Sequence, residues 1–271
     1  MTIHKAQNAP PAPRPRRQRV QAIATGMIVL KGLAQLGGRA SLTALARHVS
    51  ENPAKVHRYL ISLMDEGLVS QDPASSQYYL GAACIHIGLA AMRLADPIRV
   101  AEPALLRLRE TLEMTCFIAV MGNKGPTIVR FEEPGLPVTL NVRVGSVLPL
   151  LWSATGRVCL SFLDDSRVHL LAQGELRAAS AAQRAMLAAR DPIGHIQREV
   201  RAAGMAVVKD TNLQGISAIA VPLHDFSGHV CAVLTVLGAT GGFEASADSA
   251  VARMMLAEAK AISAALGRAG G

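Results

Sequence analysis

Apolar side chains recur every three or four residues along the first third of the chain, which is the period of a helix with one buried face. The pattern predicts helices over residues 22–36, over a second segment opened by Ser41, and over residues 53–66. Ser41 supplies a hydroxyl N-cap, and Asn52 caps the third helix just before Pro53, whose missing N–H costs nothing in a first turn. The chain therefore begins with three short helices, and a tight break separates the last two.

Two short extended runs follow the third helix. Residues 68–71 and 77–80 flank the turn formers at 72–76, which is the pattern of a β-hairpin. Three helices with a short turn between the second and third, followed by a hairpin, describe a winged helix-turn-helix. In this fold the first turns of the third helix lie in the major groove of DNA.

The third helix crowds basic side chains onto its first turns. Lys55 and Arg58 fall on the face opposite the apolar stripe that begins at Val56, and His57 lies near the boundary. The positive end of the helix dipole points the same way. A solvated helix face with incidental positive charge is the alternative, and the surrounding helix and hairpin pattern favours DNA.

The rest of the chain alternates between helical and extended patterns. Residues 82–95 predict an amphipathic linker helix, which could also pair with its copy in a second subunit. Beyond it, strands come in hairpins with helices between them, which predicts an α+β domain with an antiparallel sheet and flanking helices. The helices are expected at residues 98–114, 154–163, 166–172, 192–203 and 246–266, and the strands at 115–121, 127–132, 138–142, 205–209, 216–223 and 229–237.

Composition narrows the class of protein. Of the 271 residues half are apolar and only 3% are aromatic, which argues against an aromatic platform for single-stranded bases. No uncharged run reads as a membrane span, and the Pro- and Arg-rich start lacks the apolar stretch of a signal peptide, so a cytoplasmic protein is expected. The four cysteines follow no CxxC pattern and are expected to be buried thiols, with no metal or cofactor.

Charge is spread unevenly along the chain. Residues 1–80 hold ten Lys/Arg and four Asp/Glu, whereas residues 81–271 hold eighteen and sixteen. The positive excess in the first third predicts a polyanionic partner for that part. Prolines preclude a helix over residues 1–19, which form a basic arm whose Arg16, Arg17 and Arg19 could touch phosphates or a minor groove. A solvated tail is the alternative.

One stretch of the second domain suggests a ligand site. Residues 143–163, RVGSVLPLLWSATGRVCLSFL, lead an apolar run into a helix that begins near Ser153. Its unpaired N–H groups, the hydroxyls of Ser153 and Thr155 and an approachable backbone at Gly156 suit the carboxylate of a small organic acid, with Trp152 as a pocket wall. An ordinary capped helix with a core tryptophan is the alternative. A hydrolase using Ser153 or Cys159 is a weaker hypothesis, because no base lies nearby in the sequence and no catalytic signature occurs.

Taken together, the chain resembles the IclR family of bacterial transcriptional regulators over roughly residues 20–268. The resemblance rests on KVHRYL and YYLG in the first part, and on RVGSVLPL, SATG and GISAIAVPLHDFSGHV in the second. It implies a winged helix-turn-helix domain, a GAF-like domain that senses a small metabolite, and dimers or dimers of dimers on palindromic promoter DNA.

The resemblance also implies site residues. It places Ala54, Lys55, Val56, His57 and Arg58 nearest the DNA, and Ser153, Thr155, Gly156, Asp210, Ser217 and Ala218 at the effector pocket. The residues themselves add Asn52, Arg16, Arg17 and Arg19 to the expected DNA-binding set, and Trp152 to the expected effector-binding set.

Departures from the family pattern fall in the expected pocket. Many members have histidine where this chain has Trp152, a glycine-lysine pair where it has Gly156-Arg157, and cysteine where it has Ala218. The effector therefore does not transfer from better-known members. The segments HRYL and RLADP are similar to those of family members encoded near aromatic-acid breakdown operons. This similarity suggests a role in aromatic-acid catabolism.

The expected organisation is a basic arm over residues 1–19, a winged helix-turn-helix over 20–81, a linker helix over 82–97 and an effector-binding domain over 98–268. The leading hypothesis is a ligand-responsive regulator without catalytic activity. An architectural DNA-binding protein that senses no ligand is the alternative.

Overall fold

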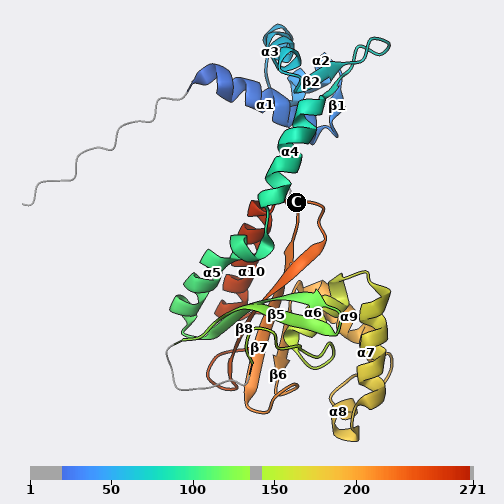
Figure 1. Ribbon diagram of the computed structural model, residues 1–271, viewed down its shortest axis with the longest axis vertical. Helices are drawn as coiled ribbons and strands as arrows, with labels where there is room; N and C mark the ends of the chain where they lie inside the picture. The colour runs from blue at the N-terminus through green and yellow to red at the C-terminus, as the bar shows by residue number, and fades with distance from the viewer. Residues whose placement is uncertain (1–19, 135–141, 269–271) are drawn as a thin grey trace, which may run out of the picture. The chain divides into compact units, whose positions relative to one another are not determined.

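The computed structural model describes residues 20–134 and 142–268, which form two compact units that divide between Leu94 and Ala95 (Figure 1). Two predictions lie outside the described residues: the basic arm with Arg16, Arg17 and Arg19, and most of the strand expected at 138–142. Val142, the end of that expected strand, is described and is not in a strand.

The N-terminal unit contains the predicted three helices and hairpin. A two-residue strand, β1, was not predicted, because so short a segment carries no periodicity; it extends the hairpin to a three-stranded antiparallel sheet of order β1-β3-β2. The elements are α1 (Gln21–Gln35), β1 (Arg39–Ala40), α2 (Leu42–His48), α3 (Pro53–Asp65), β2 (Val69–Gln71), β3 (Tyr78–Leu80) and α4 (Ala82–Leu94).

The predicted caps hold both helices of the helix-turn-helix. The Ser41 hydroxyl accepts the N–H of Ala44 at 3.2 Å, and the Asn52 amide oxygen accepts the N–H of Ala54 at 2.8 Å. Replacing such a cap with alanine typically costs about 1 kcal/mol. The two caps therefore fix where α2 and α3 begin, and with them the residues that stand at the exposed start of α3.

The glycine of the YYLG motif has a steric role. A Cβ on Gly81 would lie 2.2 Å from the carbonyl oxygen of Gly67, and the Gly81 N–H donates to the Leu68 carbonyl at 2.8 Å. Gly67 itself has φ of 66°, which favours glycine. The two glycines bring the end of α3 and the start of α4 into backbone contact, so the motif reflects close packing.

The C-terminal unit confirms the predicted α+β class. Its five strands form one antiparallel sheet of order β5-β4-β8-β7-β6. Helix α8 was not predicted, and α10 begins at Ala250, later than expected, because Ser249 caps it. The elements are α5 (Pro97–Leu112), β4 (Thr115–Gly122), β5 (Gly125–Glu132), α6 (Ala154–Phe162), α7 (Ser166–Ala178), α8 (Ala181–Ala185), α9 (Pro192–Ala203), β6 (Ala206–Lys209), β7 (Ile216–His224), β8 (Val230–Ala239) and α10 (Ala250–Ala265).

Each face of this sheet builds its own core. Helices α6, α7 and α9 pack on one face, and α5 and α10 lie side by side on the other (Figure 1). Strand alternation divides the residues between the two: in β8, Val233 and Leu237 face the α6 layer, whereas Leu234 and Val236 face the α10 layer. The side of the sheet toward α6 contains the predicted ligand stretch.

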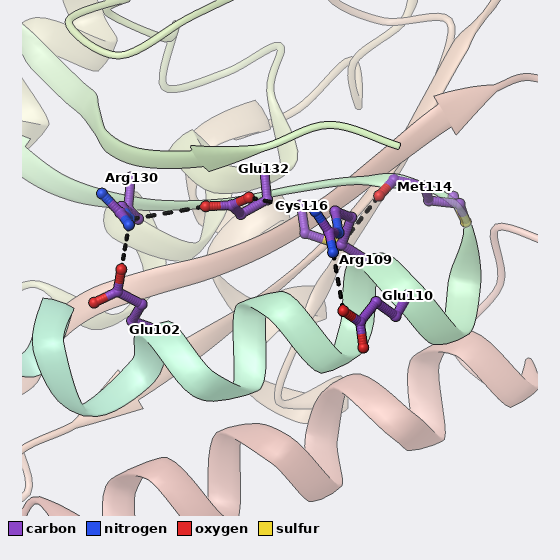
Figure 2. Close-up of polar contacts among 7 residues, drawn as sticks. All are labelled: Glu102, Arg109, Glu110, Met114, Cys116, Arg130 and Glu132. Carbon is purple, nitrogen blue, oxygen red and sulfur yellow. Dashed lines mark hydrogen bonds and ion pairs between the residues drawn. The ribbon is translucent and has the colours of Figure 1, made fainter. Parts of the chain in front are cut away.

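A chain of charged side chains ties α5 to the edge strand β5 (Figure 2). Arg130 of β5 pairs with Glu102 of α5 and lies 3.9 Å from the Glu132 carboxylate, which is in turn 3.9 Å from Arg109 of α5. These groups are partly exposed, so each ion pair adds little to the free energy of unfolding, about 0–1 kcal/mol. They nevertheless place charge along the outer strand of the sheet, which discourages pairing with another strand.

Helix α4 leads into α5 through two residues, Ala95 and Asp96. The Asp96 carboxylate accepts the N–H of Ile98 at 2.9 Å and so caps α5 ahead of Pro97. Among the described residues, no helix is long and apolar enough to cross a membrane.

Candidate nucleic-acid interface and ligand cavity

The first turns of α3 carry the exposed residues expected to meet DNA. Ala54, His57 and Arg58 are exposed, and Asn52 is exposed at the cap. Within the described chain, Arg58 takes part in no ion pair, so its guanidinium is available to a phosphate or a base edge. His57 was placed near the apolar boundary by the sequence pattern, and the structure puts it in solvent.

Two other residues of the predicted DNA-binding set are placed differently. Val56 is fully buried in the core of the N-terminal unit, so its side chain cannot contact DNA. The ammonium of Lys55 lies 2.8 Å from the Glu51 carboxylate, one helical turn before it. Lys55 is therefore partly neutralised. The periodicity placed both on the helix correctly, and it could not show that Glu51 reaches back to Lys55.

The positive excess of the first third comes mostly from the arm. Residues 20–80 hold only five Lys/Arg against four Asp/Glu. The charge argument therefore applies to residues 1–19, which lie outside the described residues, more than to the winged helix-turn-helix itself. The other five basic residues of the first eighty are Lys5, Arg14, Arg16, Arg17 and Arg19.

The C-terminal unit encloses a small cavity between α6 and the sheet. Its volume is about 40 Å³, room for only a few water molecules. No charged side chain lines it among the described residues. The lining residues are Phe117, Val142, Leu148, Ser153, Ala154, Thr155, Val208, Asn212, Leu213, Ile216, Ala218, Thr235 and Leu237.

Polar groups at the start of α6 face this cavity. The Ser153 hydroxyl donates to the Pro149 carbonyl at 2.6 Å and accepts the Gly156 N–H at 2.9 Å, so its hydrogen bonds are used. The hydroxyls of Thr155 and Thr235 share one hydrogen bond of 2.9 Å, which leaves one hydroxyl hydrogen of the pair free. The N–H groups of Ala154 and Thr155 have no acceptor in the described part of the chain. A helix start with free donors favours a negatively charged group.

Of the predicted effector-binding residues, Ser153, Thr155 and Ala218 line the cavity. Trp152 is buried in the core and does not line it. At Gly156, a Cβ would lie 2.0 Å from the Pro149 carbonyl oxygen, so the close approach expected from a ligand is made by the protein's own backbone. Both residues shape the entry to α6 without facing the cavity, and their part in effector binding stays a prediction.

Asp210 and Ser217, two further predicted effector-binding residues, make hydrogen bonds within the protein. The Asp210 carboxylate accepts the Gly215 N–H at 2.7 Å and the Thr240 hydroxyl at 2.9 Å, and Asp210 has φ of 55°. Ser217 is buried and its hydroxyl lies 2.9 Å from that of Thr240. Both side chains therefore fasten the loop before β7, and neither lines the cavity.

Sequence reasoning missed Thr235, Asn212 and Phe117, which line the cavity. Thr235 carried a usable signal, because it is the one hydroxyl in the apolar run VCAVLTVL. Phe117 and Asn212 carried none, since an aromatic in a strand and an asparagine in a loop are ordinary.

The segment that leads into α6 is held from several sides. Glu175 of α7 accepts the N–H groups of Leu150 and Leu151 at 2.7 and 2.9 Å, and Arg157 donates from Nε to the Leu151 carbonyl at 2.9 Å. Burial raises the pKa of Glu175 and lowers the pKa of Arg157. Arg157 thus holds the backbone of this segment in place.

The geometry gives no support to a nucleophile at this site. Burial raises the pKa of the Cys159 thiol to about 12, so the reactive thiolate is scarce at neutral pH. The Ser153 hydroxyl is directed at the Pro149 carbonyl. Across the described residues, no group of three His, Cys, Asp or Glu is placed to hold a metal ion.

A winged helix-turn-helix unit joined to an α+β unit is the organisation of a transcriptional regulator with a DNA-binding and an effector-binding domain. Two family models match the chain: the IclR helix-turn-helix domain over residues 17–73, and the bacterial transcriptional regulator IclR C-terminal domain over residues 90–264. The chain belongs to the IclR family of bacterial transcriptional regulators.

Individual regulators are also similar to this chain over most of its length. The crystal structure of Pseudomonas aeruginosa HmgR is 37% identical, with a TM-score of 0.83 over 93% of this chain and 100% of that one. The DNA-binding transcriptional repressor YiaJ of Escherichia coli is 25% identical over 252 residues, 91% of this chain and 88% of its own. The Pca regulon regulatory protein of Pseudomonas putida is 26% identical over 240 residues, 84% and 81% of the two chains.

Proposed function

We propose that the chain binds two-fold symmetric promoter DNA through α3 and responds to a small organic acid bound at the start of α6. The capped, exposed start of α3 supports the DNA half most directly. There Ala54, His57 and Arg58 stand clear of the core while Val56 anchors the helix to it. Arg58 is the expected base or phosphate contact, and Lys55 contributes less because of Glu51.

Selection of bound sequences from random double-stranded DNA tests this half. The full-length protein is expected to enrich a two-fold symmetric site. If Arg58 contacts a base, Arg58→Ala should weaken binding to that site by on the order of 1–3 kcal/mol. If Arg58 contacts a phosphate, the variant should lower the slope of affinity against salt concentration by about one. Lys124→Ala, which removes one charge from an exposed turn of the other unit, is the matched control.

Two results would count against this DNA-binding proposal. Equal affinity of Arg58→Ala and Lys124→Ala for the selected site would remove α3 from the interface. Salt-sensitive binding with no enriched sequence would favour the alternative of an architectural DNA-binding protein, which contacts phosphates and does not recognise bases.

The cavity at the start of α6 is the proposed effector site. Free N–H groups of Ala154 and Thr155 and the Thr155–Thr235 hydroxyl pair suit a carboxylate, and Phe117 and Leu237 suit an apolar or aromatic body. Its volume of about 40 Å³ is smaller than an aromatic acid, so binding must widen it. We propose aromatic-acid catabolism as the regulated process, supported by the HRYL and RLADP segments, which resemble those of family members near aromatic-acid breakdown operons.

A thermal-unfolding screen of aromatic and aliphatic monocarboxylic acids, each beside its neutral amide, tests the effector site. A ligand that binds only the folded state raises its stability. The expected result is stabilisation by an acid and not by its amide, lost in Thr235→Val. Stabilisation unchanged in Thr235→Val would place the ligand elsewhere, and none by any acid would favour a regulator of another effector class.

Helix α4 supports a homodimer. Three large apolar residues on one stripe are exposed, Ile85, Leu89 and Met92, at 63%, 47% and 44%, and two more, Ile87 and Leu94, are exposed on the other side of the helix at 61% and 74%. Such a stripe is typical of an interaction surface. Sedimentation should show a dimer that Leu89→Glu weakens and Ala90→Glu, off the stripe, does not. A monomeric wild-type protein would refute the pairing. If the two variants weakened the dimer equally, the stripe would not be the dimer interface.

A further inference from the structure

A second, larger concavity lies in the C-terminal unit, away from the start of α6. It has a volume of about 540 Å³ and is bordered by the ends of α6 and α9, by β7 and by α10. We call it the α10 groove. Its lining includes the apolar residues Phe162, Pro222 and Leu256 and several basic ones.

The charges that line the α10 groove are all of one sign. Arg201, Lys260 and Arg268 border it, together with His224, and no Asp or Glu is among its described lining residues. None of the three cationic side chains forms an ion pair with the described part of the chain, whereas Arg107, on α5 of the same unit, pairs with Glu258. An uncompensated positive concavity attracts anions.

Hydrogen bonds fix which way the donors point. His224 Nδ1 lies 2.7 Å from an Arg268 guanidinium nitrogen. Because a guanidinium only donates, Nδ1 must accept, and the ring proton sits on Nε2. The neighbouring Ser263 hydroxyl, only 2% exposed, accepts the His224 backbone N–H at 3.0 Å, and no described residue accepts the hydroxyl's own hydrogen. The groove is thus lined by donors.

Helix ends account for part of this charge. Arg201 donates from Nε to the Ser161 carbonyl at 2.5 Å, near the C-terminus of α6, and cations are favoured at helix C-termini. Lys260 has no such partner, because it lies more than one turn before the end of α10. Capping therefore explains Arg201 and leaves Lys260 available, together with the Arg268 N–H groups that do not donate to His224.

We propose that the α10 groove is a second ligand site, for an organic dianion whose apolar body packs on Phe162 and Leu256 while Lys260 and Arg268 hold its charges. The proposal is independent of the effector cavity, which has no charged lining residue in the described chain. The two sites share elements: α6 contributes Thr155 to the cavity and Phe162 to the groove, and β7 contributes Ala218 and His224. Occupancy of one is therefore expected to change affinity at the other.

Isothermal titration of the full-length protein with phenyl phosphate tests the proposal. This probe is a dianion with an aromatic body above its second pKa of about 6. Lys260→Gln and Arg268→Gln should each weaken binding roughly tenfold, the loss typical of one charge-assisted hydrogen bond. Both side chains are exposed, so neither change threatens folding. Lys124→Gln removes the same charge from an exposed turn and should leave binding within about twofold.

Three results would overturn the proposal: no binding of phenyl phosphate at millimolar concentration, binding that neither groove variant weakens, or equal affinity for inorganic phosphate, which has no apolar body. Thr235→Val separates the sites. It should leave phenyl phosphate binding intact even if it abolishes effector binding, and loss of phenyl phosphate binding in Thr235→Val would assign the probe to the effector cavity. The His224 ring signals in NMR should shift as phenyl phosphate is added, and in Arg268→Gln the same shift should need roughly tenfold more probe.

Discussion

The hydroxyl oxygens of Thr155, at the start of α6, and Thr235, in the middle of β8, lie 2.9 Å apart, and each residue is only 1% exposed. This single contact joins the helix layer to the sheet beside the cavity. In β8 the residues on either side of Thr235 face the opposite core, so the hydroxyl is the one polar side chain of that strand turned toward α6.

Breaking this pair on one side should cost more than removing it whole. Thr155→Val or Thr235→Val leaves a buried hydroxyl without a partner, which costs about 1–3 kcal/mol of unfolding free energy, whereas the double variant replaces both groups with apolar ones of similar shape and should be close to neutral. Urea unfolding of the four proteins measures this. Strictly additive losses would show that the hydroxyls do not depend on each other.

Gly156→Ala should destabilise the C-terminal unit. Its Cβ would lie 2.0 Å from the Pro149 carbonyl oxygen, so the segment fastened by Glu175 must move, and overpacking of this kind costs about 1–3 kcal/mol or more. Gly174→Ala in α7 is the control, since its Cβ would meet nothing within 4 Å and alanine favours a helix by about 0.5–1 kcal/mol. Thermal unfolding should move in opposite directions for the two. Comparable melting temperatures would mean that the segment yields freely.

The buried thiols should resist modification in the native protein. Burial raises the pKa of both Cys116 and Cys159 to about 12 and that of Cys231 to about 11, so the thiolate fraction of each rises with pH only well above pH 9. Cys84, half-buried on α4, should be alkylated first at pH 8. Mass spectrometry of partly labelled protein identifies the order. Early labelling of Cys159 would revive the nucleophile hypothesis.

Asp210 should act on the loop before β7 and only indirectly on the ligand. Asp210→Ala removes the acceptor for the Gly215 N–H and the Thr240 hydroxyl, and also places alanine at φ of 55°, so a loss of about 1–2 kcal/mol is expected. Asp210→Asn tolerates that backbone conformation and retains an acceptor oxygen, so it should lose less. An equal loss in the two variants, measured by urea unfolding, would mean that the carboxylate charge itself matters.

The sequence predicted local features well and tertiary partners poorly. The caps Ser41 and Asn52 were readable because a cap and its helix are neighbours in the chain. The sequence suggested an approachable backbone at Gly156, and only the fold shows that the Pro149 carbonyl lies against it. Thr235 was missed because it meets Thr155 eighty residues away. The ion pair between Lys55 and Glu51 was not predicted, because a helix pattern does not show which rotamer Glu51 adopts.

The two-residue joint between α4 and α5 limits how the units can communicate. Each residue has two soft backbone torsions. Asp96 precedes a proline, which confines it to extended conformations, and its carboxylate caps α5 at Ile98. The φ of Pro97 is fixed by its ring. Few torsional degrees of freedom remain, and most belong to Ala95. A difference in orientation between a ligand-bound and a ligand-free regulator that arises at this joint must therefore be expressed mainly in the two backbone torsions of Ala95.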